Sequence, residues 1–504
     1  MTNPGEITSA APVIGASLLA LFLGALDALV MSTAMPTIVA DLGGLSLFSW
    51  VYSGYFLARA VSLPIFGKLA DLFSNKTLFL ISTSLFLLAS IAAGCAVTMP
   101  FLIAARLFQG IGAGGNFALV YIILSDISRP ERRGRMLSLA SSVWGISSVL
   151  GPSLGGFIVS YFSWRWIFFI NVPIGLLSLL GIGLYLTDRR EKPKEVTLDF
   201  AGGALLCLSV VACILVFVAG GRHVAWTSPQ IILLTGLSLL AGFGFYHVER
   251  RARHPILNVG FFRFQGFVIG NAAPFFSSFA IFSLFAYAPL FIQGALGKTP
   301  LEVGAGMLSL SLGWSVGSLV LGQIIHRLGK RRAALLGSVF FLSGSLMTLF
   351  FSLQTTMLQC VLALCLVGLG MGFVTLATML VVQDSVDAAN LGVATSSNQF
   401  FRTLGSAVGV GVSGGFVTGE ITRALQAGRQ ADALAALPPE MVERLQNNIE
   451  SLFQPEIQSA LPPSMSAVLN QAVVNGVSTA FWIAFGAALL SLGLCFWLPE
   501  SKRE

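Results

Sequence analysis

The sequence predicts an all-α polytopic membrane protein, from its composition, the lengths of its apolar segments and the placement of its charges. Of its 504 residues, 55% are hydrophobic and only 10% are charged, and the mean hydropathy is +0.84. Soluble domains carry about 25% charged residues. Apolar runs long enough to cross a hydrocarbon core of roughly 30 Å recur along the chain. The lipid bilayer is therefore the first partner we expect.

Fourteen apolar segments are long enough to span that bilayer, with bounds that are approximate by several residues. We expect transmembrane helices at 13–36, 48–67, 77–97, 100–125, 136–159, 166–187, 200–219, 229–247, 266–292, 303–325, 333–353, 356–382, 392–417 and 474–498. The first Lys or Arg of the chain is Arg59, so the N-terminus lacks the basic region of a cleaved signal. The first span is expected to be an uncleaved anchor.

The net charge of +7 is distributed in a way that argues against a nucleic-acid partner. Of the 29 Lys and Arg residues, 20 fall in alternate connections and the C-terminal tail. The opposite short connections hold only Arg165, Arg222 and Lys298. Because positive charge collects on the cytoplasmic side of membrane proteins, this pattern predicts that both termini are cytoplasmic.

An internal repeat divides the chain into two halves. Residues 110–156 align without gaps on 368–414, which places Asp126 on Asp384. Duplicated halves of six spans are a known plan for secondary transporters. We expect an N-terminal six-helix bundle at 1–187, two inserted transmembrane helices with their flanks at 188–265, and a C-terminal six-helix bundle at 266–504.

The segment 418–473 interrupts the second half as a polar outer loop with two Pro-Pro pairs. We expect a solvated cap with short amphipathic helices. A role in binding a partner stays open for this loop, and a periplasmic adaptor is the candidate.

No motif indicates a cofactor or a metal. All six cysteines lie in apolar segments without metal-like spacing to His, which predicts free thiols. Residues 292–299 resemble a phosphate loop only superficially, since Ile292 stands where the first Gly is required. An ion gradient is the energy source that remains.

A stretch rich in glycine and proline lies in the fifth span and contains Gly145, Gly151, Pro152, Gly155 and Gly156. A proline removes one backbone donor and clashes with the preceding turn. In lipid, such a break survives where neighbouring protein satisfies the freed carbonyl, and glycines let two backbones approach closely. The stretch is expected to be a bendable, tightly packed helix contact, as a transporter requires.

With these motifs in view, the chain resembles the major facilitator superfamily, and specifically its fourteen-span drug:proton antiporter branch. The matching elements, in chain order, are Leu26-Asp27 with Pro36, Gly67-Lys68-Leu69-Ala70-Asp71, Arg106-Leu107-Phe108-Gln109-Gly110, the 145–156 stretch, Trp164-Arg165-Trp166 with Asn171 and Pro173, and Arg402-Thr403-Leu404-Gly405. The resemblance implies two pseudo-symmetric six-helix bundles plus two inserted helices, in a monomer of the cytoplasmic membrane that needs no cofactor.

Asp27 is the residue we expect to couple protons, because it is the only one of 22 acids near the middle of a span. A charged carboxylate at that depth costs roughly 2.5–3.5 kcal/mol on insertion scales. Burial favours its neutral form and a nearby arginine favours its charged form. The resemblance implies that Arg106 lies near this acid and assists proton release, with Gln109 on the same helix face. A permanent structural ion pair is the alternative.

A substrate cavity is expected where polar and aromatic residues share helix faces. Asn116 follows Gln109 by seven residues and continues its stripe. The candidates for the lining are Tyr52, Tyr55, Arg59, Asn116, Phe117 and Trp314, together with Trp144. Arg59 could neutralise Asp27 or meet an anionic group on the substrate, and both roles stay open.

Two further groups carry expected roles. The resemblance implies that Gly67, Lys68 and Asp71 form a cytoplasmic gate, although residues 72–76 depart from the usual pattern. Arg402 and Gly405, in the thirteenth span, are expected to pack between the halves rather than to contact substrate.

The function that follows is proton-coupled export of small amphipathic drugs or related compounds by alternating access. Three arginines lie within the spans against one acid, which is less suited to a lipophilic cation. A second function therefore stays open, that of a dedicated exporter of an anionic or neutral metabolite, lipid or siderophore. A non-transporting receptor or scaffold that uses the 418–473 loop is a third. An enzyme is not expected, since no Ser/His/Asp set, metal cluster or carboxylate pair lies at one depth.

Overall fold

The computed structural model describes residues 4–128, 133–187, 200–219, 227–252, 259–387, 390–429 and 463–500, and these form helices joined by short connections, without a β-strand. Among these residues, eleven helices are long and apolar enough to cross a membrane. The other three predicted spans also fall on helices. These are α2 (Phe48–Leu72), α8 (Phe200–Ala219) and α12 (Lys330–Thr348). The predicted all-α fold with fourteen spans is confirmed.

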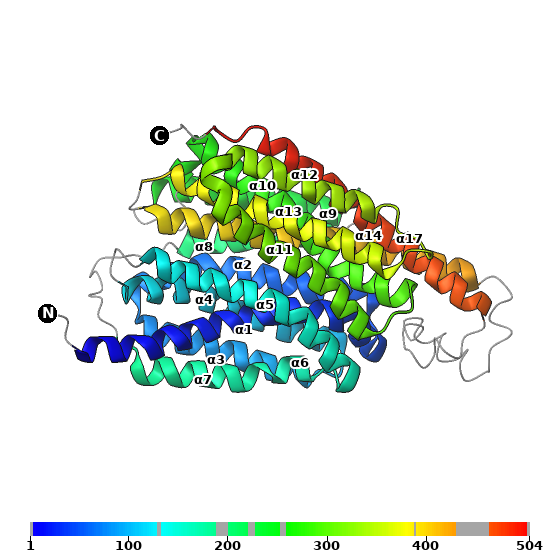
Figure 1. Cartoon of the computed structure of the whole chain (residues 1–504), viewed down its shortest axis with the longest axis horizontal. Helices are drawn as coiled ribbons and strands as arrows, with labels where there is room; N and C mark the ends of the chain where they lie inside the picture. Colours follow the sequence, from blue (N-terminus) through cyan, green and yellow to red (C-terminus); the bar gives the residue numbers. More distant parts are fainter. Residues whose placement is uncertain are drawn as a thin grey trace.

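The remaining helices follow the predicted order along the chain (Figure 1). In the first half they are α1 (Pro4–Leu42), α3 (Asn75–Gly94), α4 (Met99–Asp126), α5 (Arg133–Tyr161), and a sixth span split into α6 (Trp166–Phe169) and α7 (Asn171–Tyr185). In the second half they are α10 (Gln265–Leu290) with a π turn η4 (Phe291–Ala295), α11 (Pro300–Leu328), α13 (Met357–Asp384), α14 (Leu391–Arg429) and α17 (Pro463–Cys495). Between the halves, α9 (Pro229–Arg251) follows α8.

Local sequence sets where several helices begin. Thr299 and Thr356 each form a capping box with the side chain three residues later, Glu302 and Gln359 respectively. Such a box satisfies amide donors at the first turn that have no partner within the helix. Proline at the first position, as at Pro300, suits the turn because its missing N–H is not needed there.

The two halves repeat the same packing. Helix α1 packs against α5 and α7, and α10 packs against α14 and α17 in the same way. The pairs α2–α4 and α3–α4 correspond to α11–α13 and α12–α13. A polar contact also recurs at equivalent places. In the first half Asn75 donates to Asp126 at 3.2 Å, and in the second half Lys330 pairs with Asp384. The domain boundaries at 187 and 265 stay predictions.

The halves meet along two seams, α2 against α14 and α5 against α11. Ser53 Oγ donates to the Ala407 carbonyl at 3.0 Å, and Gln293 Nε2 donates to Thr37 Oγ1 at 3.5 Å. The rings of Phe48 and Tyr287 lie 5.3 Å apart. These residues lie toward the end of the molecule where α1 ends and α2 begins, which we call the loop end. The other end, which holds both chain termini, we call the termini end (Figure 1).

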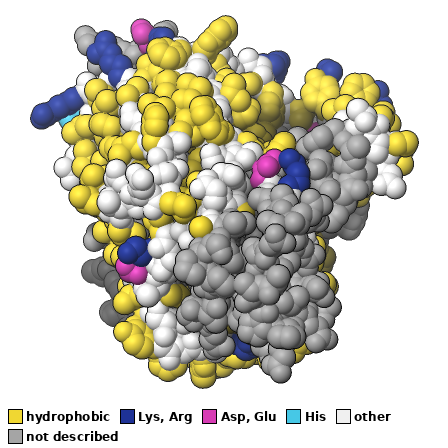
Figure 2. Space-filling model, turned by 90° about the vertical axis from the view of Figure 1, so that its right-hand side faces the viewer, with side chains coloured by type: hydrophobic (Ala, Val, Ile, Leu, Met, Phe, Trp, Pro, Cys, Tyr) yellow, Lys and Arg dark blue, Asp and Glu magenta, His cyan; other side chains and the backbone are white. Residues whose placement is uncertain are grey.

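The inserted helices lie beside one seam. Helix α8 packs against both α2 and α14, and α9 packs mainly against α8. Many leucines on the outside of the helices are exposed, including Leu233 at 73% and Leu184 at 72%. Apolar exposure of this extent along the sides of the helices marks a surface that meets lipid, as expected of a multi-pass membrane protein. Seen from the loop end, the described surface also carries many hydrophobic side chains, and the charged ones form small separate groups (Figure 2).

Candidate functional site

Asp27, in the middle of α1, is the centre of a buried polar cluster. Arg106 Nη1 lies 2.5 Å from Asp27 Oδ2, and both residues are 1% exposed. Gln109 Nε2 donates to Asp27 Oδ1 at 2.8 Å, and Asn171 Nδ2 donates to the same oxygen at 3.2 Å. Both carboxylate oxygens of Asp27 therefore accept hydrogen bonds from side chains of other helices.

A second ring of contacts holds these partners in place. Ser90 Oγ accepts from Gln109 at 3.2 Å and from Asn171 at 3.0 Å, and it donates to the Phe168 carbonyl at 2.9 Å. Arg106 also donates to Gln109 Oε1 at 2.7 Å. The Asp27 carboxylate therefore joins α1, α4 and the start of α7, and Ser90 connects α3 to the same cluster.

The sequence did not single out Ser90 or Asn171 as site residues. Asn171 stands in the motif that opens the sixth span, so a signal for it was available. Ser90 is one of many serines in apolar helices, and nothing in its sequence context separates it from the others.

The cluster is not fully satisfied. Arg106 Nε and Asn171 Oδ1 are buried without a hydrogen-bond partner. The Arg106 guanidinium instead lies 4.0 Å from the centre of the Tyr55 ring, where the ring face attracts the positive charge. Removing one partner from a buried ion pair costs about 3–5 kcal/mol because it leaves an uncompensated charge. A proton arriving at Asp27 would therefore change the balance of every contact around it.

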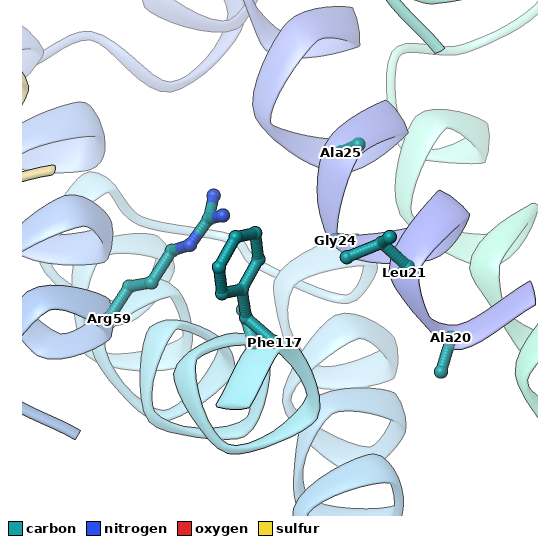
Figure 3. Close-up of a pocket in the computed structure, with 7 residues that line it drawn as sticks. Ala20, Leu21, Gly24, Ala25, Arg59 and Phe117 are labelled. Atoms are coloured by element: carbon teal, nitrogen blue, oxygen red, sulfur yellow. The ribbon is translucent and has the colours of Figure 1, made fainter. Parts of the chain in front are cut away.

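Asp27 pairs with Arg106 and not with Arg59. The Arg59 guanidinium lies 5.0 Å from the Phe117 ring and 5.1 Å from the Trp144 ring, and Arg59 is 5% exposed. Among the described residues it forms no ion pair, and its Nε atom is buried without a partner. Together with Phe117 it lines a small pocket, which faces Gly24 and its neighbours on α1 (Figure 3).

The other predicted cavity residues have different positions. Tyr52 and Tyr55 are buried, and their hydroxyls donate to the carbonyls of Met31 and Gly24 on α1, at 3.1 and 3.3 Å. Trp314 of α11 is partly buried, and the Arg402 guanidinium lies 5.7 Å from the centre of its ring.

Asn116 packs between helices instead of lining a cavity. Its Oδ1 accepts from Ser82 at 2.7 Å and from Thr83 at 2.8 Å, both on α3. Gln109 also reaches α3, where it donates to Ser90 at 3.2 Å. The two residues therefore share one face of α4, as their spacing of nearly two helical turns predicts, but at Asn116 that face is filled by contacts with α3.

The glycine stretch of α5 contacts two helices. A Cβ atom added at Gly151 would lie 2.7 Å from Leu29 Cβ, and one at Gly155 would lie 2.8 Å from the Val30 carbonyl oxygen, both on α1. A Cβ at Gly156 would lie 2.8 Å from the Pro300 carbonyl oxygen on α11. Gly145 meets only Ser315, at an ordinary 3.8 Å.

Pro152 is part of the same contact between α5 and α11. A Cβ added at Gly304 of α11 would lie 2.8 Å from the Pro152 carbonyl oxygen. Helix α5 therefore links α1 to the opposite half.

Gly405 departs from the expected packing between halves. Its Cα faces α10 of its own half, where an added Cβ would lie 3.1 Å from Phe275 Cα. The contact between halves on α14 falls instead at Ala407 and Gly414. The reason is helical phase, because residues two positions apart point to different sides of one helix.

The predicted cytoplasmic gate lies at the end of α2. Gly67 faces open space and Lys68 is partly buried, whereas the Asp71 side chain lies outside the described residues. The role of the three residues stays a prediction. Nowhere in the described ranges do three His, Cys, Asp or Glu side chains gather as a metal site requires.

Comparison with known proteins agrees with this architecture. The multidrug transporter protein MdtP of Bacillus subtilis is 31% identical over 512 residues, which cover 99% of this chain and 94% of the relative. Multidrug resistance protein 3 of Bacillus subtilis is 31% identical over 496 residues, which cover 98% and 95%.

A solved structure shares the fold. The bacterial homologue of the human lysosomal transporter Spinster, in an inward-facing and occupied conformation, superposes with a TM-score of 0.68 at 13% identity, covering 98% of this chain and 97% of that one. The model of the Major Facilitator Superfamily matches residues 17–410. As the sequence motifs implied, the chain belongs to the major facilitator superfamily, in the branch of its multidrug efflux transporters.

Proposed function

We propose that this protein exports small amphipathic compounds across the cytoplasmic membrane in exchange for protons. The observation that carries the proposal is the Asp27 cluster, a carboxylate with 1% exposure held by Arg106, Gln109 and Asn171. The relatives MdtP and multidrug resistance protein 3 are named for multidrug transport and resistance, which supports drugs or similar compounds as cargo. Membership in a superfamily of transporters argues against an enzyme.

Proton binding at Asp27 would rearrange the cluster. In the charged state the carboxylate accepts from Arg106, Gln109 and Asn171. Once protonated, the acid no longer balances the Arg106 charge, so the guanidinium must seek another partner or more water. Each elementary charge moved across 100 mV supplies about 2.3 kcal/mol, which is enough to bias two conformations of similar free energy.

The glycine stretch of α5 would transmit that rearrangement from α1 to the other half. Leu29 and Val30 follow Asp27 on α1 and pack on Gly151 and Gly155 of α5. The next residue, Gly156, packs against α11. Small residues at such contacts let one helix move past another. If both termini are cytoplasmic, contacts at the loop end close the outer side, and this conformation faces inward.

Reconstituted protein tests the coupling. Proteoliposomes with an imposed pH gradient should accumulate a fluorescent amphipathic dye, and Asp27→Asn should abolish the accumulation driven by the gradient. Asp41→Asn is the matched control, because Asp41 is on the same helix but half exposed, in an ion pair with Arg165. Gradient-driven accumulation that is equal in Asp27→Asn and wild type would refute proton coupling through this acid.

A further inference from the structure

Among the described residues, two buried arginines, one from each half, form no salt bridge, although Asp27 and Tyr55 interact electrostatically with Arg59. Arg59 is on α2 and Arg402 is on α14. Within the described part of the chain neither forms an ion pair, and the Nε atom of each is buried without a hydrogen-bond partner. Among the described residues, the Arg402 side chain donates one long hydrogen bond, of 3.5 Å, to Gln399 Oε1. Arg106 shows the contrast, since it has both a carboxylate and an amide partner.

The two arginines lie at the same level of the bundle. The bond from Ser53 to Ala407 closes the α2–α14 seam. Arg59 lies six residues beyond Ser53 and Arg402 five residues before Ala407, roughly 8–9 Å along each helix at 1.5 Å per residue. Because these helices run in opposite directions, both shifts are toward the termini end. The two charges are close enough to repel each other, and Tyr121 of α4 interacts electrostatically with both.

Aromatic rings surround these charges. Phe117 and Trp144 flank the Arg59 guanidinium at 5.0 and 5.1 Å, and Trp314 lies 5.7 Å from that of Arg402. Trp144 and Trp314 adjoin the second seam, where the hydroxyls of Ser148 and Ser315 lie 2.9 Å apart. The aromatic and cationic groups therefore lie between the two seams, just on the termini side of the closed contact.

From this arrangement we infer that the region between the two seams binds an organic anion with an aromatic body. The negative group of this anion would lie between Arg59 and Arg402. This inference rests on the proposed transport function and specifies its class of substrate. Two guanidinium groups that form no salt bridge within the described residues and repel each other in a region of low dielectric are unfavourable, and one anion between them relieves both. The rings of Phe117, Trp144 and Trp314 offer faces for an aromatic ring to stack. A lipophilic cation meets repulsion at the same place.

The site also gives the substrate a part in the conformational change. The ligand would contact α2 of one half and α14 of the other. Without it, repulsion between the arginines favours separation of the halves at the termini end. With the anion in place, the repulsion becomes attraction toward a shared charge, which favours closure of that end. A ligand shifts a conformational equilibrium only by binding one state better, and here the difference is this pair of contacts.

A charge series of one fluorophore tests the inference in wild-type protein. Purified protein in nanodiscs is titrated with pyrene carrying a butyrate, a butyramide or a butyl-trimethylammonium group, and binding is followed by energy transfer from tryptophan. We expect the butyrate to bind at least about tenfold tighter than the cation, since hydrogen bonds to charged groups are worth about one such factor each. Equal affinities, or tighter binding of the cation, would overturn it.

Arginine variants locate the site. Arg59→Gln and Arg402→Gln should each weaken butyrate binding roughly tenfold and leave butyramide binding unchanged, while Arg59→Lys should restore part of the affinity. Arg423→Gln is the matched control, since Arg423 is on α14 but 67% exposed and pairs with Glu420. An unchanged affinity for pyrenebutyrate in both Gln variants would refute the assignment. Displacement of the probe by sulfate at the same concentration as by unlabelled pyrenebutyrate would also refute it, because sulfate has no aromatic body.

The binding assay is independent of proton coupling. Binding in nanodiscs is measured without a pH gradient across the membrane, so its result does not depend on proton-driven transport. Loss of charge selectivity with intact Asp27-dependent transport would refute the substrate class alone. Retained selectivity without proton-driven transport would refute the proposed function and leave the anion site standing.

Discussion

Gly156 of α5 and Gly304 of α11 face each other across the interface between the halves, and neither leaves room for a side chain on the other. A Cβ added at Gly156 would lie 3.3 Å from Gly304 Cα, and one added at Gly304 would lie 3.4 Å from Gly156 Cα. Backbone carbonyls of Pro300 and Pro152 lie still closer, at 2.8 Å. This contact holds the loop end closed in the present conformation.

We predict that Gly156→Val opens the loop end. A branched side chain there must overlap backbone atoms, which cannot move aside as a flexible side chain can. Spin labels on the loop-end residues of α5 and α11 should therefore show a longer distance distribution than in otherwise wild-type protein. Gly145→Ala is the control, because its nearest neighbour would lie 3.8 Å away. An unchanged distance distribution in Gly156→Val would contradict this account of the seam.

Arg106 and Asp27 should behave as one energetic unit. Arg106→Gln leaves a buried carboxylate without its main partner, and we expect it to lower the free energy of unfolding by about 3–5 kcal/mol. The double variant Asp27→Asn/Arg106→Gln removes both charges and should recover much of that loss. Thermal unfolding in detergent, read as a double-mutant cycle, measures the coupling. Additive effects of the two substitutions would show that the pair is not coupled in solution.

Ser90 should matter more than its sequence context suggests. Ser90→Ala removes one acceptor shared by Gln109 and Asn171 and one donor to the Phe168 carbonyl. Leaving buried polar groups unsatisfied costs about 1–3 kcal/mol, so stability should fall by that amount. Ser343→Ala should cost far less, because Ser343 is exposed and bonds only to the Val339 carbonyl of its own helix. Equal effects of the two substitutions would argue against the cluster described around Ser90.

Much of the fold was predictable because lipid constrains each segment by itself. Helix length and apolar composition follow from the thickness of the bilayer, so all fourteen spans were placed without knowledge of their neighbours. The internal repeat was equally visible, and the matching contacts of Asp126 and Asp384 correspond to it. Asp27 stood out for the same reason, since a mid-span acid is costly wherever its helix packs.

The sequence by itself therefore determined the properties of each helix taken alone: where it begins and ends, and which of its residues are costly in lipid. It also determined which family the motifs match. The tertiary structure decided which side chains meet. Arg59 and Arg106 are equally plausible partners for Asp27 in the sequence, and only the packing of α4 against α1 and α3 selects Arg106. The face of α4 that carries Asn116 is filled by α3, and Gly405 faces another helix than expected because contacts depend on the rotation of each helix, which hydropathy and spacing do not fix.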